Sequence, residues 1–236
     1  MSLADREREK YLRAFETPGY RDKNQGLLLW QNTRGIFPAK PKSAIDIGCG
    51  DGRLFSVWNL AGIDGWGVDF INVLDKFHGF KEKFVEANLW EPLLSRRNYD
   101  VTNLDSAEAP KYPPARFELG VCADVMEHIP PEKVDEVLAN ICPLAEHTIF
   151  EIANYPSIYG DLHLSLHDEG WWYKKLAEHG TPELLENKRE GVREYIFRFT
   201  PRRSIADIDL TASAHSVASS EEKIQNVARK RWPRGR

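Results

Sequence analysis

The amino-acid sequence predicts an α/β fold built on a doubly wound, mostly parallel sheet. Short apolar runs that stop at glycine or at an acidic residue alternate along the chain with segments of helical periodicity. Such alternation is typical of a parallel sheet whose two faces are covered by helices. A later run at 193–199 alternates charged and aromatic residues, which predicts an antiparallel strand that closes the sheet.

Two helices are expected before the first strand, at 3–16 and 24–36, because each places apolar residues among polar ones at helical spacing. Pro38 and Pro41 end this pattern. We therefore predict an N-terminal helical cover at 1–40, followed by one domain at 41–200.

The elements of the predicted domain follow in order. The strands are expected at 43–47, 65–69, 83–88, 117–123, 147–152 and 193–199. The helices between them are expected at 53–61, 71–77, 131–141 and 168–179, the third opened by a proline in its first turn. Residues 95–114 are polar and contain three prolines, which predicts a surface insertion. Apolar residues become sparse near the end of the chain, so 201–236 is predicted to be a flexible basic tail.

Composition limits the kinds of partner. The 236 residues carry a net charge of -4, so no overall positive field favours nucleic acid, and the basic tail is interpreted as a solvated terminus. No run approaches the roughly 20 apolar residues of a membrane span, so no membrane partner is predicted. The three cysteines form no C-x-x-C pair, which favours a reducing, cytoplasmic location. The oligomeric state stays unknown at this stage.

The strongest motif is the run Ala-Ile-Asp-Ile-Gly-Cys-Gly-Asp-Gly-Arg-Leu at 44–54, a strand that leads through three glycines into a helix. Glycines at such a turn let the backbone approach a ligand, because a Cβ would occupy the ligand's space. A dinucleotide fingerprint needs a third glycine where this chain has Arg53. The run instead resembles the first motif of the class I S-adenosylmethionine-dependent methyltransferases, which have a Rossmann-like fold with a seven-stranded sheet.

The resemblance covers about 40–200 and implies S-adenosylmethionine as the cofactor. Asp69, at the end of the second strand, would bind both ribose hydroxyls. Asn88 would contact the adenine edge after the third strand, where the family more often carries aspartate. Without a ligand these segments would be ordinary strand–helix turns, with Asp69 as an N-cap. The other residues that the resemblance assigns to the cofactor are Asp46, Gly48, Cys49, Gly50, Gly52, Phe70, Leu89, Ala123, Asp124 and Val125.

The segment Asp124-Val-Met-Glu127-His128 resembles the family's motif after the fourth strand, where cofactor and methyl acceptor meet. In-line transfer to a hydroxyl requires a group that removes a proton, and a histidine suits that role. The candidate catalytic bases are His128 and His163. The candidate substrate residues are Glu127, His167 and Trp172.

The same residues have a second interpretation. Asp124-x-x-Glu127-His128 followed by His163 resembles a divalent-metal site in O-methyltransferases of ubiquinone biosynthesis and of RNA 3′ ends, which usually carry glutamate at the first position. Carboxylates and imidazoles are reasonable ligands for a cation that orients and acidifies a hydroxyl. We favour the metal-free interpretation, in which Glu127 and His128 bind backbone groups of the loop, and we assign no metal ligand.

The sequence therefore predicts transfer of a methyl group to a hydroxyl or amine of a small molecule or glycan. Two other functions stay open. A nicotinamide-dependent oxidoreductase is disfavoured by Arg53 and by the lack of a Tyr-x-x-x-Lys helix. The third possibility is a non-catalytic binding module that keeps the methyltransferase fold as a scaffold.

Overall fold

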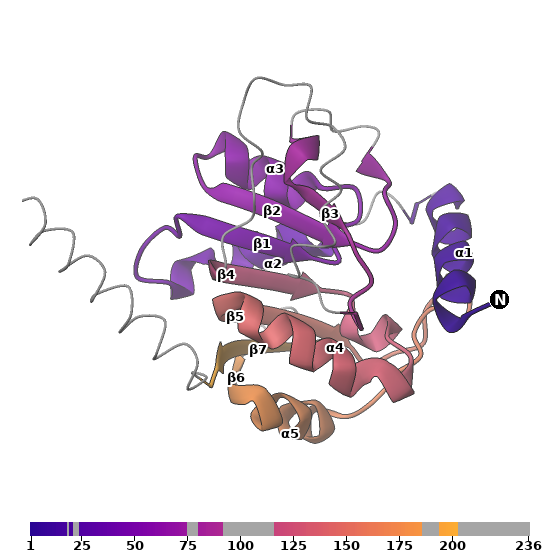
Figure 1. Ribbon diagram of the computed structural model, residues 1–236. Coiled ribbons are helices and arrows are strands. Elements are labelled where there is room, and N and C mark those ends of the chain that lie inside the picture. Colours follow the sequence, from indigo (N-terminus) through magenta and orange to yellow (C-terminus); the bar gives the residue numbers. More distant parts are fainter. Residues whose placement is uncertain (18, 21–23, 75–79, 92–115, 186–193, 203–236) are drawn as a thin grey trace, which may run out of the picture. The chain divides into compact units, whose positions relative to one another are not determined.

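The computed structural model describes residues 1–17, 19–20, 24–74, 80–91, 116–185 and 194–202 (Figure 1). Met1–Pro201 form one compact unit around a seven-stranded sheet with the order β3-β2-β1-β4-β5-β7-β6. The strands are β1 Ser43–Ile47, β2 Asp64–Asp69, β3 Phe84–Glu86, β4 Phe117–Ala123, β5 Ala145–Ala153, β6 Gly180–Leu185 and β7 Glu194–Pro201.

The pairing of the strands places a ligand site at a definite point of the sheet. Strands β1 to β5 pair in parallel, and β7 runs antiparallel to both β5 and β6. The chain leaves β1 toward β2 and β3 on one side and returns to β4 on the other. Ligands of open α/β sheets bind outside the carboxyl ends of the strands at such a switch point. The cleft is therefore expected where β1 and β4 end.

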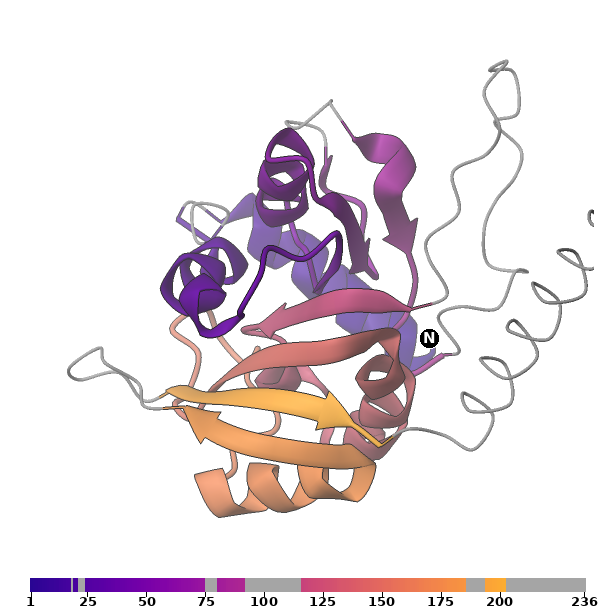
Figure 2. The same cartoon turned by 90° about the vertical axis from the view of Figure 1, so that its left-hand side faces the viewer.

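Four helices cover the two faces of the sheet: α2 Gln25–Thr33, α3 Arg53–Leu60, α4 Val134–Ile141 and α5 Glu169–His179. Helices α2 and α3 pack on one face through an apolar cluster that includes Leu29, Phe55 and Trp58. Helices α4 and α5 pack on the other face, where Leu138 and Trp172 belong to a second cluster. Figure 2 shows α5 beside β6 at the antiparallel edge. This is the doubly wound arrangement that the sequence predicts.

Helix α1, Leu3–Glu16, has a different position. A capping box between Ser2 and Asp5 fixes its start, and Ala14 is its one buried residue. It is held at the carboxyl ends of the strands by Arg8, whose guanidinium binds the Phe70 carbonyl and lies 2.5 Å from the Glu86 carboxylate. Figure 1 shows α1 standing apart from the helices that cover the sheet.

Most of the predicted elements are present, with shifted bounds. The predicted helix at 24–36 ends as an α-helix at Thr33 and continues as a 3₁₀ turn. The predicted helix at 71–77 is wrong at residues 71–73, which are irregular, and residues 75–77 lie outside the described residues. The insertion at 95–114 and nearly all of the tail at 201–236 also lie outside them.

Strand β6 has no counterpart among the strand ranges predicted from the sequence. It pairs with β7 alone and forms the edge of the sheet, and its one buried residue is Pro182. Proline is confined to edge strands because it cannot donate to the ladder. A strand with one buried position carries little apolar alternation, which explains why the sequence pattern did not reveal it.

Among the described residues, no helix combines the length and the apolar character that a membrane span requires.

Candidate active site

Close contacts require glycine in the turn that follows β1. Gly48 has a φ of 71°, and its N–H bonds the carbonyl of Val68 at 2.8 Å. A Cβ on Gly48 would lie 2.4 Å from Cγ2 of Val125, so only glycine lets the two loops approach. Gly50 has a φ of 52° and open space beside it up to Phe15, at 3.6 Å from an added Cβ. The turn thus presents bare backbone at the switch point of the sheet.

Gly52 has a different role from the other two glycines. It is the N-cap of α3, with a φ of 77°, and an added Cβ would lie 2.6 Å from Leu74 and 2.7 Å from Phe55. It lines neither of the cavities described below. Its contacts support helix packing.

Asp69 ends β2 and is held by the backbone on both sides. Its Oδ2 accepts a hydrogen bond from the Gly50 N–H at 2.9 Å, and its Oδ1 accepts one from the Ile71 N–H at 3.2 Å. Burial raises the pKa of this carboxyl, and the backbone N–H donors act in the opposite direction. The carboxylate is therefore oriented beside the glycine turn, as the prediction of a ribose ligand requires.

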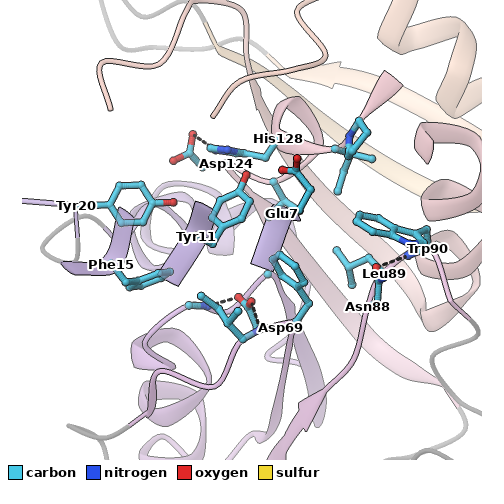
Figure 3. Close-up of a pocket in the computed structure, with 17 residues that line it drawn as sticks. Glu7, Tyr11, Phe15, Tyr20, Asp69, Asn88, Leu89, Trp90, Asp124 and His128 are labelled. Atoms are coloured by element: carbon cyan, nitrogen blue, oxygen red, sulfur yellow. Dashed lines mark hydrogen bonds and ion pairs between the residues drawn. The ribbon is translucent and has the colours of Figure 1, made fainter. Parts of the chain in front are cut away.

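A cavity of about 120 Å³ connects Asp69 with His128 (Figure 3). The residues that follow β2 and β3 form one side: Asp69, Phe70, Ile71, Asn88, Leu89 and Trp90. The glycine turn and the segment after β4 form the other: Gly48, Gly50, Asp124, Val125, His128, Ile129 and Pro130. We call this space the first cavity. It brings together most of the residues that the sequence assigned to the cofactor.

The N-terminal residues Glu7, Tyr11, Phe15 and Tyr20 close the first cavity, and the sequence reasoning missed them. The ring of Tyr11 lies between Phe70 and His128, at centroid distances of 5.5 and 5.7 Å. Its buried hydroxyl has no hydrogen-bond partner among the described residues, and burial raises its pKa well above the usual value. The phenol therefore stays protonated and available as a donor.

A second cavity of about 100 Å³ adjoins the first. The two share Phe15, Tyr20, Gly48, Gly50 and Asp124 as lining residues. The residues that line only the second cavity are Asn24, Gln25, Gly26, Asp46, Cys49, Asp51 and Ala123. The predicted cofactor residues Asp46, Cys49 and Ala123 thus lie here, at the carboxyl ends of β1 and β4.

Four side chains meet where the first cavity borders the segment after β4; two of them, Asp124 and His128, line the cavity. The four residues are Asp124, Glu127, His128 and His163. Each offers one oxygen or nitrogen atom as a ligand, and these four atoms all lie within 4.8 Å of one another. Asp124 has a left-handed φ of 58° at the point where the chain leaves β4. Loop contacts hold His128 and His163 edge to face, with ring centroids 4.6 Å apart.

Backbone groups orient both imidazoles of this cluster in the same way. Nδ1 of His128 lies 3.1 Å from the Leu162 carbonyl, and Nδ1 of His163 lies 2.5 Å from the Tyr155 carbonyl. Each Nδ1 must donate to its carbonyl, and in a neutral ring this puts the lone pair on Nε2. Burial lowers the pKa of His128 to about 4, so that ring is neutral.

Glu127 and Asp124 bring two acidic side chains close together in this cluster. Glu127 is fully buried, and its Oε1 accepts a hydrogen bond from the Ala153 N–H at 2.8 Å. Its Oε2 has no hydrogen-bond partner among the described residues. Burial, together with the neighbouring Asp124, raises the pKa of Glu127 well above its usual value. Two facing carboxylates need either a shared proton or a cation between them.

The cluster fits a divalent cation. Ligand bonds of roughly 2.1 Å place donor atoms up to about 4.2 Å apart, close to the 4.8 Å limit found here. Two carboxylates and two imidazoles form a mixed oxygen and nitrogen set of the kind that Mn²⁺, Fe²⁺ and Zn²⁺ accept. Carbonyl partners on Nδ1 are the usual support of ligating histidines. The backbone bonds of the metal-free interpretation are present, but among the described residues no hydrogen bond is made to Oε2 of Glu127 or to Nε2 of either histidine.

The remaining predicted substrate residues lie elsewhere. His167 stacks on Trp171 at a centroid distance of 3.7 Å, and Trp172 is fully buried in the core cluster with α4. Neither lines either cavity. Glu127 and His163 also do not line them and stand behind His128.

Solved structures share this fold. The chain is 16% identical to a 1,6-didemethyltoxoflavin-N1-methyltransferase from Burkholderia thailandensis, solved with its substrate and S-adenosylhomocysteine, over 85% of this chain and 88% of that one, with a TM-score of 0.54. It is 18% identical to a SAM-dependent methyltransferase from Archaeoglobus fulgidus over 80% and 98%, with a TM-score of 0.53. No curated protein sequence gives a significant match.

The fold and the site thus define a Rossmann-like protein of the methyltransferase type, and the predicted fold class is confirmed. Residues 20–186, more than two thirds of the chain, match a family described as a methyltransferase domain, and the chain belongs to this family. It is a class I S-adenosylmethionine-dependent methyltransferase, as the motifs predicted. Family membership removes the nicotinamide-dependent oxidoreductase as an alternative.

Proposed function

We propose that this methyltransferase transfers the methyl group of S-adenosylmethionine to a hydroxyl of a small molecule, and that Asp124, Glu127, His128 and His163 hold a divalent cation beside that hydroxyl. One observation carries the proposal. The first cavity begins at the carboxylate of Asp69 and ends at His128, whose Nε2 lies 4.0 Å from the Asp124 carboxylate within the four-residue cluster.

The residues around the first cavity contact different parts of the cofactor. Asp69 binds the ribose, Phe70 lies beside the adenine, and Asn88 contacts its edge through the side-chain amide. The backbone at Gly48 and Gly50 leaves room for the cofactor. These roles deepen the sequence predictions, and each rests on a residue that lines the cavity.

The acceptor side is apolar next to the cluster. Ile129 and Pro130 follow His128 in the chain and line the same cavity, so an aliphatic part of a small acceptor has surface to pack on. The Burkholderia neighbour was solved with bound 1,6-didemethyltoxoflavin, which supports a small-molecule acceptor. A glycan acceptor, the lack of nucleic-acid and membrane partners, and a cytoplasmic location stay predictions.

The cluster supplies the chemistry that a hydroxyl needs. A bound divalent cation lowers the pKa of a hydroxyl beside it and fixes the position of its oxygen. The carbonyls of Leu162 and Tyr155 keep both Nε2 lone pairs directed into the cluster. The Ala153 N–H binds Oε1 of Glu127 and thereby fixes this carboxyl group close to Asp124. Exclusion of water by Tyr11 and Phe15 strengthens these interactions.

The test combines product analysis with metal binding. The protein is incubated with methyl-labelled S-adenosylmethionine and a small-molecule extract, and labelled products are identified by mass spectrometry. We expect methyl ethers, loss of activity with a chelator and recovery with Mn²⁺ or Zn²⁺. Calorimetric titration of Mn²⁺ into the protein without acceptor should show one site, which His163→Ala abolishes. His147→Ala is the matched control, because His147 bonds Thr200 and lies outside the cluster.

Other outcomes assign the chemistry differently. Full activity in the presence of a chelator would exclude the cation from the reaction. His128 or His163 would then be the base for a hydroxyl acceptor, or the acceptor would be an amine. Cofactor binding without any labelled product from any extract would favour the non-catalytic scaffold.

A further inference from the structure

The loop after β5 carries His163 and is bound to two parts of the domain. Near His163, the N–H groups of Leu164 and Ser165 donate to the Glu127 carbonyl at 2.7 and 2.9 Å. This end of the loop is therefore fixed to the segment after β4, which supplies the other three members of the cluster. The end next to β5 is bound instead to β7, the antiparallel strand that pairs with β5.

Tyr155 connects β7 with His163. Its hydroxyl donates to Oε1 of Glu194, the first residue of β7, at 3.1 Å. Its carbonyl accepts from Nδ1 of His163 at 2.5 Å, and its ring centroid lies 5.5 Å from that of the imidazole. The side chain and the backbone of one residue are thus fixed by two different partners.

The backbone of Tyr155 is restricted further by its neighbours in the chain. Pro156 follows it, and the residue before a proline is limited mainly to extended conformations. Asn154 precedes it and donates from its side chain to the Tyr195 hydroxyl at 2.7 Å. Two adjacent residues of β7 therefore bind two adjacent residues of the loop. The contact made by Tyr155 is the one that continues to an imidazole of the cluster.

We infer that Tyr155 and Glu194 are positioning residues that hold the imidazole of His163 in the tautomer with its lone pair on Nε2. The hydroxyl bond to Glu194 fixes Tyr155, and the Tyr155 carbonyl then keeps the proton of His163 on Nδ1. Outer contacts of this kind orient ligating histidines and set their tautomer. Without the bond to Glu194 the carbonyl shifts relative to the ring, and the proton is distributed over both nitrogens.

The inference rests on the proposed function, because that proposal makes His163 a ligand of the cation. Its test therefore has two readouts. NMR of the metal-free protein with ¹⁵N-labelled histidine reports the tautomer, since protonated and unprotonated ring nitrogens have different chemical shifts, and His163→Ala identifies the signals. Calorimetric titration of Mn²⁺ measures the consequence for binding. If wild type binds no Mn²⁺, the proposed cation fails, and the NMR signals still test the positioning role.

Four variants and a control separate the contacts. Tyr155→Phe removes the hydroxyl and keeps the ring beside His163. Glu194→Ala removes the acceptor, whereas Glu194→Gln keeps an acceptor oxygen. The double variant of Tyr155→Phe and Glu194→Ala shows whether the two residues act through one contact, because the effects of coupled residues do not add. Tyr173→Phe, the same change at an exposed residue of α5, is the matched control. A thermal melt of each variant in chelator confirms that it is folded.

We expect Tyr155→Phe and Glu194→Ala each to populate both tautomers of His163 and to weaken Mn²⁺ binding about tenfold, with no further loss in the double variant. Glu194→Gln and Tyr173→Phe should keep the wild-type tautomer and an Mn²⁺ affinity within about twofold of wild type. An unchanged tautomer of His163 in Tyr155→Phe would overturn the inference. Additive losses of Mn²⁺ affinity in the double variant would also overturn it, because they would show that the two residues act independently.

Discussion

Replacement of Glu127 by glutamine should stabilise the metal-free protein. Glu127 is fully buried and close to Asp124, its Oε1 accepts from the Ala153 N–H at 2.8 Å, and its Oε2 has no hydrogen-bond partner among the described residues. Glutamine keeps the acceptor for Ala153 and supplies an NH₂ group toward Asp124. Relief of one unsatisfied buried group is worth about 1–3 kcal/mol. For a domain of this size, 1 kcal/mol corresponds to a shift of about 2–4 °C in Tm.

The same substitution should remove stabilisation by the cation. A ligand present at about 100 times its Kd stabilises the native protein by about 2.7 kcal/mol. Wild type should therefore gain about 5–11 °C when Mn²⁺ replaces the chelator. The Glu127→Gln variant should gain little, because one of the four ligands has lost its charge. The variant should therefore melt above wild type in chelator, and wild type should melt above the variant in Mn²⁺.

Differential scanning calorimetry in chelator and in Mn²⁺ measures both effects. Glu132→Gln, the same change at an exposed residue near α4, is the control and should leave both melting temperatures within about 1 °C of wild type. A Glu127→Gln protein that melts below wild type in chelator would refute the argument that the two carboxylates repel each other. An unchanged response to Mn²⁺ would refute the cluster as a metal site.

Three further perturbations test the cofactor side. Asp69→Asn should weaken S-adenosylhomocysteine binding by about 100-fold in calorimetry, because two hydrogen bonds to a charged acceptor are worth about 3 kcal/mol together. The exposed Asp135→Asn is the control. An unchanged affinity of the Asp69→Asn variant would exclude the ribose role. Gly48→Ala should lower the free energy of unfolding in urea by more than about 2 kcal/mol, from the clash at 2.4 Å and the left-handed φ. Adding Val125→Ala should relieve the clash and recover that part of the free energy of unfolding, so that about 1–2 kcal/mol of backbone strain remains. A double variant no more stable than Gly48→Ala would contradict the contact. Tyr11→Phe should leave the free energy of unfolding in urea within about 1 kcal/mol of wild type, since the buried hydroxyl has no partner among the described residues. The rate of methyl transfer should fall several-fold, because that hydroxyl points toward Asp124 and His128, away from Asp69 (Figure 3). A loss of stability with full activity would show a packing role instead.

Local patterns in the sequence were sufficient for the β1 turn and the acid after β2. A strand that ends in glycines and a second strand that ends in Asp69 are contiguous signals, and parallel strands bring their carboxyl ends to one edge. The same holds for the segment after β4, where Asp124, Glu127 and His128 lie within five residues. His163 joined them as a candidate through the resemblance, and the structure placed its ring 4.6 Å from that of His128.

Contacts between distant segments were not accessible in this way. Helical periodicity predicts that α1 has a buried side, but it does not say what that side covers, so Tyr11 and Phe15 were not connected with the cavity. Gln25 and Gly26 were similarly interpreted as part of an N-terminal cover. His167 and Trp172 were placed near the acceptor by their position in the chain, whereas the structure packs one on Trp171 and the other in the core.

The sequence by itself determined the class of the fold, the family and the glycine turn beside Asp69, because these depend on backbone freedom at glycines and on residues at strand ends. Only the tertiary structure decided which side chains close the first cavity and whether the acidic and imidazole groups lie close together. Those features depend on the distances between segments that are far apart along the chain. Such distances are set by the packing of α1, α2 and the loop after β5, and no local pattern contains them.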